Sequence, residues 1–151
     1  MENKQTENLS SPNSIESSVK TQSEEEVTSL LENLLYPSES DEPVVWFSFE
    51  SNLPSPLTVS DLKFYEGHAP DLRGEEVSID DFWSPLITVE DWYEEYENEK
   101  VQNALKVKQQ VENLLTHIQA FRVGQIEVDL YLVGQLAENQ WGGLKTKVIE
   151  T

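Results

Sequence analysis

Two β-forming runs meet at a glycine in the segment Ala120-Phe-Arg-Val-Gly-Gln-Ile-Glu-Val-Asp-Leu-Tyr-Leu-Val133. Residues 120–123 make the first run, Gly124-Gln125 the turn, and residues 126–133 the second run. Strict alternation of apolar and polar residues in the second run is typical of a strand with one buried face. A two-residue turn between such runs predicts an antiparallel hairpin. We expect four side chains of the second strand to point inward: Ile126, Val128, Leu130 and Leu132.

The segments on either side of this hairpin supply one long helix and one more strand. Before it, apolar residues recur at helical spacing, which predicts a helix over about residues 98–118 with one buried face. These residues are Ala104, Val107, Val111, Leu114, Leu115 and Ile118. After the hairpin, we expect residues 136–143 to form a loop that carries Trp141, and residues 144–151 to form a final strand.

The N-terminal half of the folded region begins with an amphipathic helix. Ser23 can cap this helix, and Glu26 three residues later completes a capping box. Its apolar stripe ends shortly before Pro37, which cannot continue a helix. The stripe consists of Val27, Leu30, Leu31, Leu34 and Leu35. An acidic loop follows at residues 38–43, and the β-forming residues 44–50 predict a strand that other elements cover.

Two shorter helices lie between this strand and the long helix. Thr58 and Asp61 can open the first of them, and Gly67 is a natural stop for it. Residues 68–76 are expected to form an exposed loop. Residues 78–84 predict a second, capped helical turn, in which we interpret Phe82 and Trp83 as core anchors.

The order of these elements predicts the fold class. Strands that are grouped near the end of the chain, with helices before them, favour an α+β fold whose sheet is mostly antiparallel. Because the helices fall into two groups, we expect a three-layer α/β/α sandwich with the sheet in the middle. Helices packed on one face alone are the alternative.

Residues 1–22 differ in composition from the rest of the chain. They are rich in Ser, Gln, Asn, Thr and Glu, and their few apolar residues show no sustained period. Such a segment cannot bury enough surface to offset the entropy lost on ordering. We therefore expect a disordered N-terminal arm at residues 1–22 and one folded domain at residues 23–151.

The charge balance limits the classes of partner. Ten Lys and Arg against 29 Asp and Glu give a net charge of −19. This charge repels nucleic acid and anionic membranes and attracts basic proteins. The absence of cysteine removes disulfides and thiolate metal sites. Because no apolar run reaches the length of a membrane span and no signal peptide is recognisable, we expect a cytoplasmic protein. We also expect it to be a monomer when free.

Acidic and aromatic side chains alternate in Thr88-Val-Glu-Asp-Trp-Tyr-Glu-Glu-Tyr-Glu-Asn98. Large aromatic residues beside fixed negative charge can hold a basic partner, and Trp and Tyr are common hot spots of interfaces. The structural alternative is a solvated acidic face with Trp92 as an apolar anchor that pins the helix start to the core. On this stretch alone, the structural alternative comes first.

Candidates for catalysis are few. His68 falls in a predicted loop, His117 at the predicted end of the long helix, and the carboxylates of Asp80-Asp81 and residues 94–97 could hold Mg²⁺ or act as an acid and a base. No glycine-rich phosphate loop, histidine-rich metal motif or nucleophile elbow accompanies them. We interpret these histidines as structural and these carboxylates as helix caps or solvated side chains, and we expect a protein that is not an enzyme.

Four motifs of this chain resemble those of the cyanobacterial nuclease A inhibitors, in the same order. They are Leu34-Leu-Tyr-Pro-Ser-Glu-Ser-Asp-Glu-Pro43, Thr88-Val-Glu-Asp-Trp-Tyr-Glu-Glu-Tyr-Glu-Asn98, Phe121-Arg-Val-Gly-Gln-Ile-Glu-Val-Asp-Leu-Tyr131 and Thr146-Lys-Val-Ile-Glu-Thr151. The resemblance covers about residues 25–151 and runs to the last residue.

This resemblance implies a three-layer α/β/α fold and the inhibition of a non-specific, Mg²⁺-dependent nuclease of the ββα-metal class. It implies that Glu39 enters the nuclease active site in place of the scissile phosphate. It also implies that Asp91 and Trp92 make a second contact, and that the C-terminal Thr151 approaches the catalytic metal. The inhibitor then needs no cofactor of its own, because the Mg²⁺ belongs to the nuclease.

The acidic composition agrees with that role, since a cleft that holds a polyanion must itself be basic. The alternative is an acidic interaction module of the same fold that binds a different basic partner.

Overall fold

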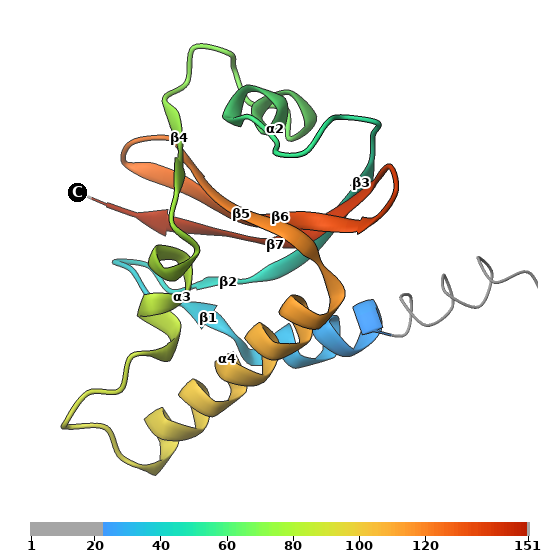
Figure 1. The fold of residues 1–151 in the computed structure, drawn as a ribbon. Helices are drawn as coiled ribbons and strands as arrows, with labels where there is room; N and C mark the ends of the chain where they lie inside the picture. Colours follow the sequence, from blue (N-terminus) through green and yellow to red (C-terminus); the bar gives the residue numbers. More distant parts are fainter. Residues whose placement is uncertain (1–22, 151) are drawn as a thin grey trace, which may run out of the picture.

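The computed structural model describes residues 23–150, so the predicted disordered arm and Thr151 lie outside the described residues. Its centre is a five-stranded sheet in the order β3-β7-β6-β5-β4 (Figure 1). All four pairs of neighbouring strands are antiparallel, which confirms the predicted α+β class with an antiparallel sheet. The strands are β3 (Val45–Glu50), β4 (Gly74–Val77), β5 (Thr116–Val123), β6 (Glu127–Ala137) and β7 (Gln140–Ile149).

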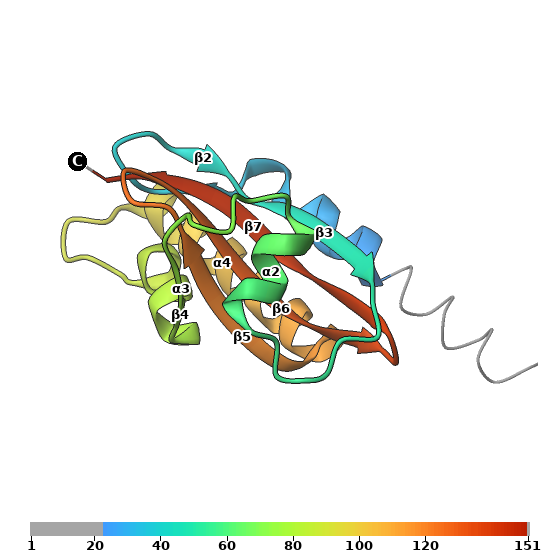
Figure 2. The same cartoon turned by 90° about the horizontal axis from the view of Figure 1, so that it is seen from above.

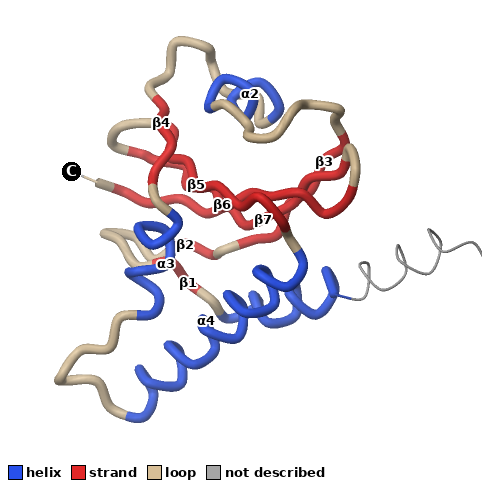
Figure 3. The backbone as a smooth tube through the Cα atoms, in the orientation of Figure 1, coloured by secondary structure: helices blue, strands red, loops and turns tan. Residues whose placement is uncertain are grey.

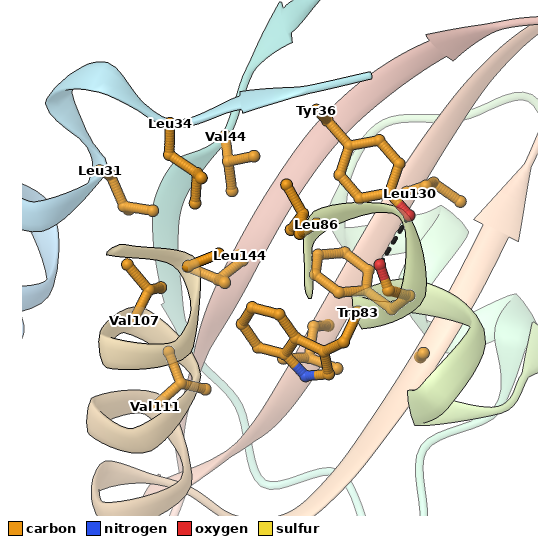
Figure 4. Close-up of a cluster of buried hydrophobic side chains, with 14 of the residues drawn as sticks. Leu31, Leu34, Tyr36, Val44, Trp83, Leu86, Val107, Val111, Leu130 and Leu144 are labelled. Atoms are coloured by element: carbon orange, nitrogen blue, oxygen red, sulfur yellow. Dashed lines mark hydrogen bonds between the residues drawn. The ribbon is translucent and has the colours of Figure 1, made fainter. Parts of the chain in front are cut away.

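Helices lie on both faces of this sheet (Figures 1 and 2). The short α2 (Val59–Tyr65) covers one face, and α3 (Ile79–Ile87) and α4 (Glu95–Leu114) cover the other. Two separate apolar clusters fill the space under them, the smaller on the α2 side and the larger on the α3 and α4 side, part of which is drawn in Figure 4. No helix within residues 23–150 is long and apolar enough to span a membrane.

The first helix is shorter than its apolar stripe predicts. Residues 23–30 are helical, a 3-10 turn η1 (Leu31–Asn33) follows, and the chain then enters β1 (Leu35–Tyr36), which pairs with β2 (Glu42–Pro43). Leu34 is buried, but Leu35 is exposed, so its predicted place on the buried stripe is wrong. The physical reason is Pro37, which favours extended backbone in the residue before it and so allows pairing with β2.

The short helices begin as predicted. Thr58 and Asp61 form a reciprocal capping box at α2, and Gly67 follows the helix end with a φ of 76°. The Ser78 hydroxyl accepts a hydrogen bond from the backbone N–H of Asp81 and caps α3. Phe82 and Trp83 are almost completely buried, which confirms them as core anchors.

The long helix begins and ends earlier than predicted. Glu94 and Glu97 cap its start, where the Glu97 carboxylate accepts a hydrogen bond from the Glu94 backbone N–H at 2.9 Å. Leu115 has extended backbone at its end, and Ile118 belongs to β5 rather than to the helix. His117 therefore lies in a strand, at a register irregularity and with a φ of 54°, and not at a helix end. The predicted helix was too long because Ile118 continues the helical spacing of apolar residues, whereas in the structure it packs against the core from β5.

The central hairpin is confirmed, but its strands are longer than predicted. β6 continues to Ala137 and β7 begins at Gln140, so Trp141 is a buried strand residue and the predicted loop at residues 136–143 is wrong. Asn139 makes this tight turn with a φ of 64°. Ile126 is exposed in the preceding turn and does not point inward, whereas Val128, Leu130 and Leu132 are buried.

The two edge strands also differ from prediction. Residues 74–77 of the predicted exposed loop form β4, because their backbone groups pair with β5 although their side chains are mostly polar. β3 pairs with β7 alone within the described sheet, and Val45 is exposed, so this strand is less covered than its composition predicts.

Candidate functional site

Glu39 lies in a short turn between β1 and β2 whose shape is held by neighbouring hydroxyls. The Ser38 hydroxyl donates to the Ser40 carbonyl oxygen at 2.6 Å and accepts from the Ser40 N–H at 3.2 Å. The Ser40 hydroxyl in turn donates to the Glu42 carboxylate. These bonds close the turn around Glu39, which is itself exposed. An exposed carboxylate is thus carried by a turn with a defined backbone.

The same turn is attached to the end of β7. The Ser38 hydroxyl accepts a hydrogen bond from the Ile149 N–H at 3.2 Å, and the Thr146 hydroxyl donates to the Pro43 carbonyl oxygen at 2.9 Å. The hairpin of β1 and β2 is therefore bonded to β7 at two points. Glu39 and the last residues of β7 are neighbours in space, although more than a hundred residues separate them in the sequence.

Tyr36 joins this hairpin to α3. Its buried hydroxyl donates to the Phe82 carbonyl oxygen at 2.6 Å, the bond that is dashed in Figure 4. Burial, and secondarily the negative charge of Asp81, raise the pKa of the Tyr36 phenol well above its ordinary value. The phenol thus stays protonated and keeps donating at alkaline pH values at which an ordinary tyrosine would ionise.

A hollow of about 710 Å³ lies between the β1–β2 turn, α3 and the end of β7. Its charged lining residues are Glu39, Asp81, Arg122 and Glu150. Arg122 is the one cationic residue among the described residues that line it, and it donates to the Glu150 carboxylate at 2.6 Å. The hollow is therefore an acidic surface with one internally paired cation.

Asp91 and Trp92 lie in the loop that joins α3 to α4. Both are exposed, and Trp92 exposes 69% of its surface. Its only described aromatic contact within residues 23–150 is with Tyr93, edge to face at 4.6 Å between ring centroids. The interpretation of Trp92 as a core anchor is therefore wrong, and the buried anchor of this region is Trp83.

These segments lie along one side of the molecule. In Figures 1 and 2 the β1–β2 turn, the loop between α3 and α4, and the end of β7 all project toward the left, and Figure 3 shows the two connections as loops. The structure thus brings the segments of Glu39, Asp91 and Trp92 to one side of the protein. Thr151 follows Glu150 at this end of β7 but lies outside the described residues.

Two of the residues weighed for catalysis, His68 and Glu97, have structural contacts. His68 Nε2 lies 2.6 Å from the Tyr131 hydroxyl, in a partly buried contact on the α2 side of the sheet. Burial, and then Glu66 and Asp129, raise the pKa of Tyr131 well above its ordinary value. The Glu97 carboxylate caps α4, as interpreted from the sequence. No group of three or more metal-ligating side chains occurs within residues 23–150.

The match to known proteins covers most of the chain. The family model for nuclease A inhibitor-like proteins matches residues 21–151. The chain belongs to the nuclease A inhibitor-like family. Membership of this family indicates an inhibitor rather than an enzyme and a nuclease as the partner. The curated proteins contain no match to this chain.

Two features of this inhibitor-like domain were missed by sequence reasoning. The first is the Ser38 hydroxyl, which fixes the Glu39 turn and bonds to β7. The second is the ion pair between Arg122 and Glu150. The resemblance included both segments, but neither hydrophobic period nor turn chemistry indicates which distant strand a serine or an arginine will reach.

Proposed function

We propose that this protein inhibits a non-specific, Mg²⁺-dependent nuclease of the ββα-metal class by occluding its active site. The observation that carries the proposal is the attachment of the Glu39 turn to the end of β7, on the same side of the molecule as the Asp91 and Trp92 loop. One protein surface can then offer a carboxylate, an acidic aromatic loop and Thr151 to the same cleft.

Glu39 is proposed to replace the scissile phosphate. A carboxylate presents negative oxygens that can accept the hydrogen bonds a nuclease makes to phosphate, and such charge-assisted bonds are the strong ones. Its turn is closed by Ser38 and Ser40 before any partner binds. Because a preorganised loop loses less conformational entropy on binding, this geometry favours affinity.

Asp91 and Trp92 are proposed to form a second contact. The exposed indole of Trp92 can bury a large apolar area against the nuclease surface, while its N–H remains available as a donor. The neighbouring carboxylates of residues 90–97 add negative charge toward a basic cleft. This combination explains an exposed tryptophan on an otherwise acidic loop.

Thr151 is proposed to approach the Mg²⁺ of the nuclease. Mg²⁺ takes oxygen ligands and usually keeps several waters, so an inhibitor oxygen can displace one of them. Thr151 directly follows Glu150, whose backbone N–H donates to the Ile126 carbonyl oxygen at 2.8 Å. The hydrogen-bonded part of β7 thus extends as far as Glu150, the residue before Thr151.

A titration against two nucleases tests this function. The protein is added to a ββα-metal nuclease and, separately, to a metal-independent nuclease whose cleft is equally basic. We expect stoichiometric loss of the first activity and little effect on the second. Unchanged activity of ββα-metal nucleases would contradict the proposal. Equal inhibition of both enzymes would instead favour an acidic module that binds basic clefts through charge alone.

A further inference from the structure

We infer that Arg122 and Ser38 are positioning residues for nuclease binding, because together they brace the end of β7 and fix Ile149 and Glu150 beside the turn that carries Glu39. This inference rests on the proposed function and deepens it. We call the contacts that act on Ile149 and Glu150 the β7 brace; they come from the side chains of Ser38 and Arg122 and from the backbone of Ile126.

The brace holds the strand end from two sides. On one side, the Ile149 N–H donates to the Ser38 hydroxyl at 3.2 Å. On the other side, the Glu150 N–H donates to the Ile126 carbonyl oxygen at 2.8 Å. Edge contacts of this kind replace the ladder bonds that a strand loses at its end, so the backbone is fixed as far as Glu150.

Arg122 fixes the side chain at the same position. It stands on β5, and its guanidinium extends past β6 to the Glu150 carboxylate at 2.6 Å. Both partners are partly exposed, at 31% for Arg122 and 49% for Glu150. Exposed ion pairs of this kind add little to global stability. The consequence of the pair is therefore the position of Glu150 rather than the stability of the fold.

The positive charge of Arg122 makes it possible to distinguish a positioning role from a contribution to electrostatic attraction. A cation within an acidic surface that must meet a basic cleft opposes association through charge. Removing it changes the net charge from −19 to −20, since one positive charge is lost. If charge alone mattered, loss of Arg122 would strengthen binding. If the brace matters, the same change must weaken binding, so the two explanations predict opposite signs.

The experiment compares Arg122→Gln and Glu150→Gln, each of which breaks the pair. Their charge changes are opposite, but we expect both to raise the inhibition constant, by roughly tenfold, which lies within the coupling range of contacting residues. The inhibition constant of the double variant should be no higher than that of the less inhibitory single variant, because both substitutions act through one contact. Arg122→Lys should restore much of the inhibition.

Lys147→Gln is the matched control. Lys147 also stands at the end of β7 and forms an exposed ion pair, with Glu127 at 2.8 Å, but this pair is outside the brace. It makes the same charge change as Arg122→Gln. We expect it to leave inhibition unchanged or slightly stronger, and we expect all the variants to keep the melting temperature of the wild type.

A measurement on the free protein tests the brace without any nuclease. We expect Arg122→Gln to lower the heteronuclear ¹⁵N NOE of the Ile149 and Glu150 amides, and Lys147→Gln to leave it unchanged. Full inhibition by Arg122→Gln, opposite effects of Arg122→Gln and Glu150→Gln, or unaltered amides would each overturn the inference. If the wild type inhibits no ββα-metal nuclease, both the proposed function and the role of the brace in nuclease binding are wrong. The amide measurement on the free protein then still decides whether the brace orders the end of β7.

Discussion

At the scale of single residues, Glu39 is the most specific element of the proposed inhibition. It is exposed, and its turn is closed by bonds between Ser38 and Ser40 that do not require the Glu39 charge. Glu39→Gln keeps the size of the side chain and removes its charge. We predict weaker inhibition by about 2–5 kcal/mol, the usual range for loss of one partner of a buried charged contact.

The control for this prediction is Glu138→Gln, which makes the same charge change in the turn between β6 and β7 at the far end of the sheet. Nuclease titrations and thermal melting of both variants distinguish a local effect from a general charge effect. Wild-type inhibition by Glu39→Gln would show that Glu39 does not replace phosphate.

Trp92 is the second residue whose role can be isolated. Because its side chain is 69% exposed, Trp92→Ala removes little core packing and should leave the melting temperature almost unchanged. We predict a loss of nuclease affinity of about 2 kcal/mol or more, as for a central aromatic hot spot. Calorimetric titration measures the affinity. A lower melting temperature together with unchanged affinity for the nuclease would contradict a role of Trp92 in the contact.

Sequence reasoning identified these residues through a family resemblance, and the residues themselves carry less information. The mixture of acidic and aromatic residues in residues 88–98 permits both a buried and an exposed Trp92, because one tryptophan without a periodic pattern of apolar neighbours does not indicate a buried face. The structure decides between them by placing Trp83 in the core instead. The hydroxyl bonds of Ser38 depend on the distant end of β7 and have no local signal.

At the scale of elements, β7 connects the fold to the proposed contact with metal. We predict that deletion of Thr151, or a tag added after it, weakens inhibition markedly and leaves the melting temperature unchanged. The tag blocks an oxygen ligand and adds bulk where the cleft should close. An N-terminal tag is the control and should be harmless. Equal inhibition constants for the untagged, C-tagged and deleted proteins would rule out a metal-directed Thr151.

Buried tyrosines provide a second prediction at this scale, about alkaline pH. Tyr36 and Tyr131 have pKa values raised by burial above the ordinary value of about 10. Above about pH 10, the unfolded chain has released these protons and the folded chain keeps them, so stability must fall as pH rises. Below pH 10 both states are protonated and this contribution is constant.

Thermal melting between about pH 8 and pH 11 measures this slope. Tyr36→Phe should flatten it, at a cost of about 1 kcal/mol at neutral pH for the lost bond to the Phe82 carbonyl oxygen. Tyr96→Phe, at an exposed position, is the control. Identical slopes for the wild type and Tyr36→Phe would show that Tyr36 titrates alike in both states.

The elements themselves were largely predictable, and their ends were not. Caps such as Thr58 with Asp61 act within a few residues, so the sequence indicates them directly. The boundary between α4 and β5 depends on pairing with β6, since Ile118 suits both a helix stripe and a strand. β4 was missed because an edge strand can be held by its backbone, with little apolar pattern in its side chains.

At the scale of the whole molecule, the proposed disordered arm can be removed as a test. The family match begins at residue 21, close to the predicted domain start. We predict that a chain beginning at Ser23 keeps both its melting temperature and its inhibition constant, because residues 1–22 have too few apolar side chains to pack. A drop of more than a few degrees would show that the arm stabilises the domain.

Net charge also acts at this scale, through the rate of encounter. A net charge of −19 attracts a basic nuclease at long range. Because salt screens this attraction, the association rate should fall as ionic strength rises. We expect dissociation to depend more on the proposed contacts of Glu39, Trp92 and Thr151. The whole surface and the specific site thus contribute to different rate constants.

Occupation of the active site is tested most directly by the initial rate of a ββα-metal nuclease at several concentrations of nucleic acid and inhibitor. We predict competition: the apparent inhibition constant rises linearly with the substrate concentration, and saturating substrate restores the full maximum rate. An inhibition constant that does not change with substrate concentration, while the nuclease still binds nucleic acid in the presence of inhibitor, would contradict occlusion of the active site.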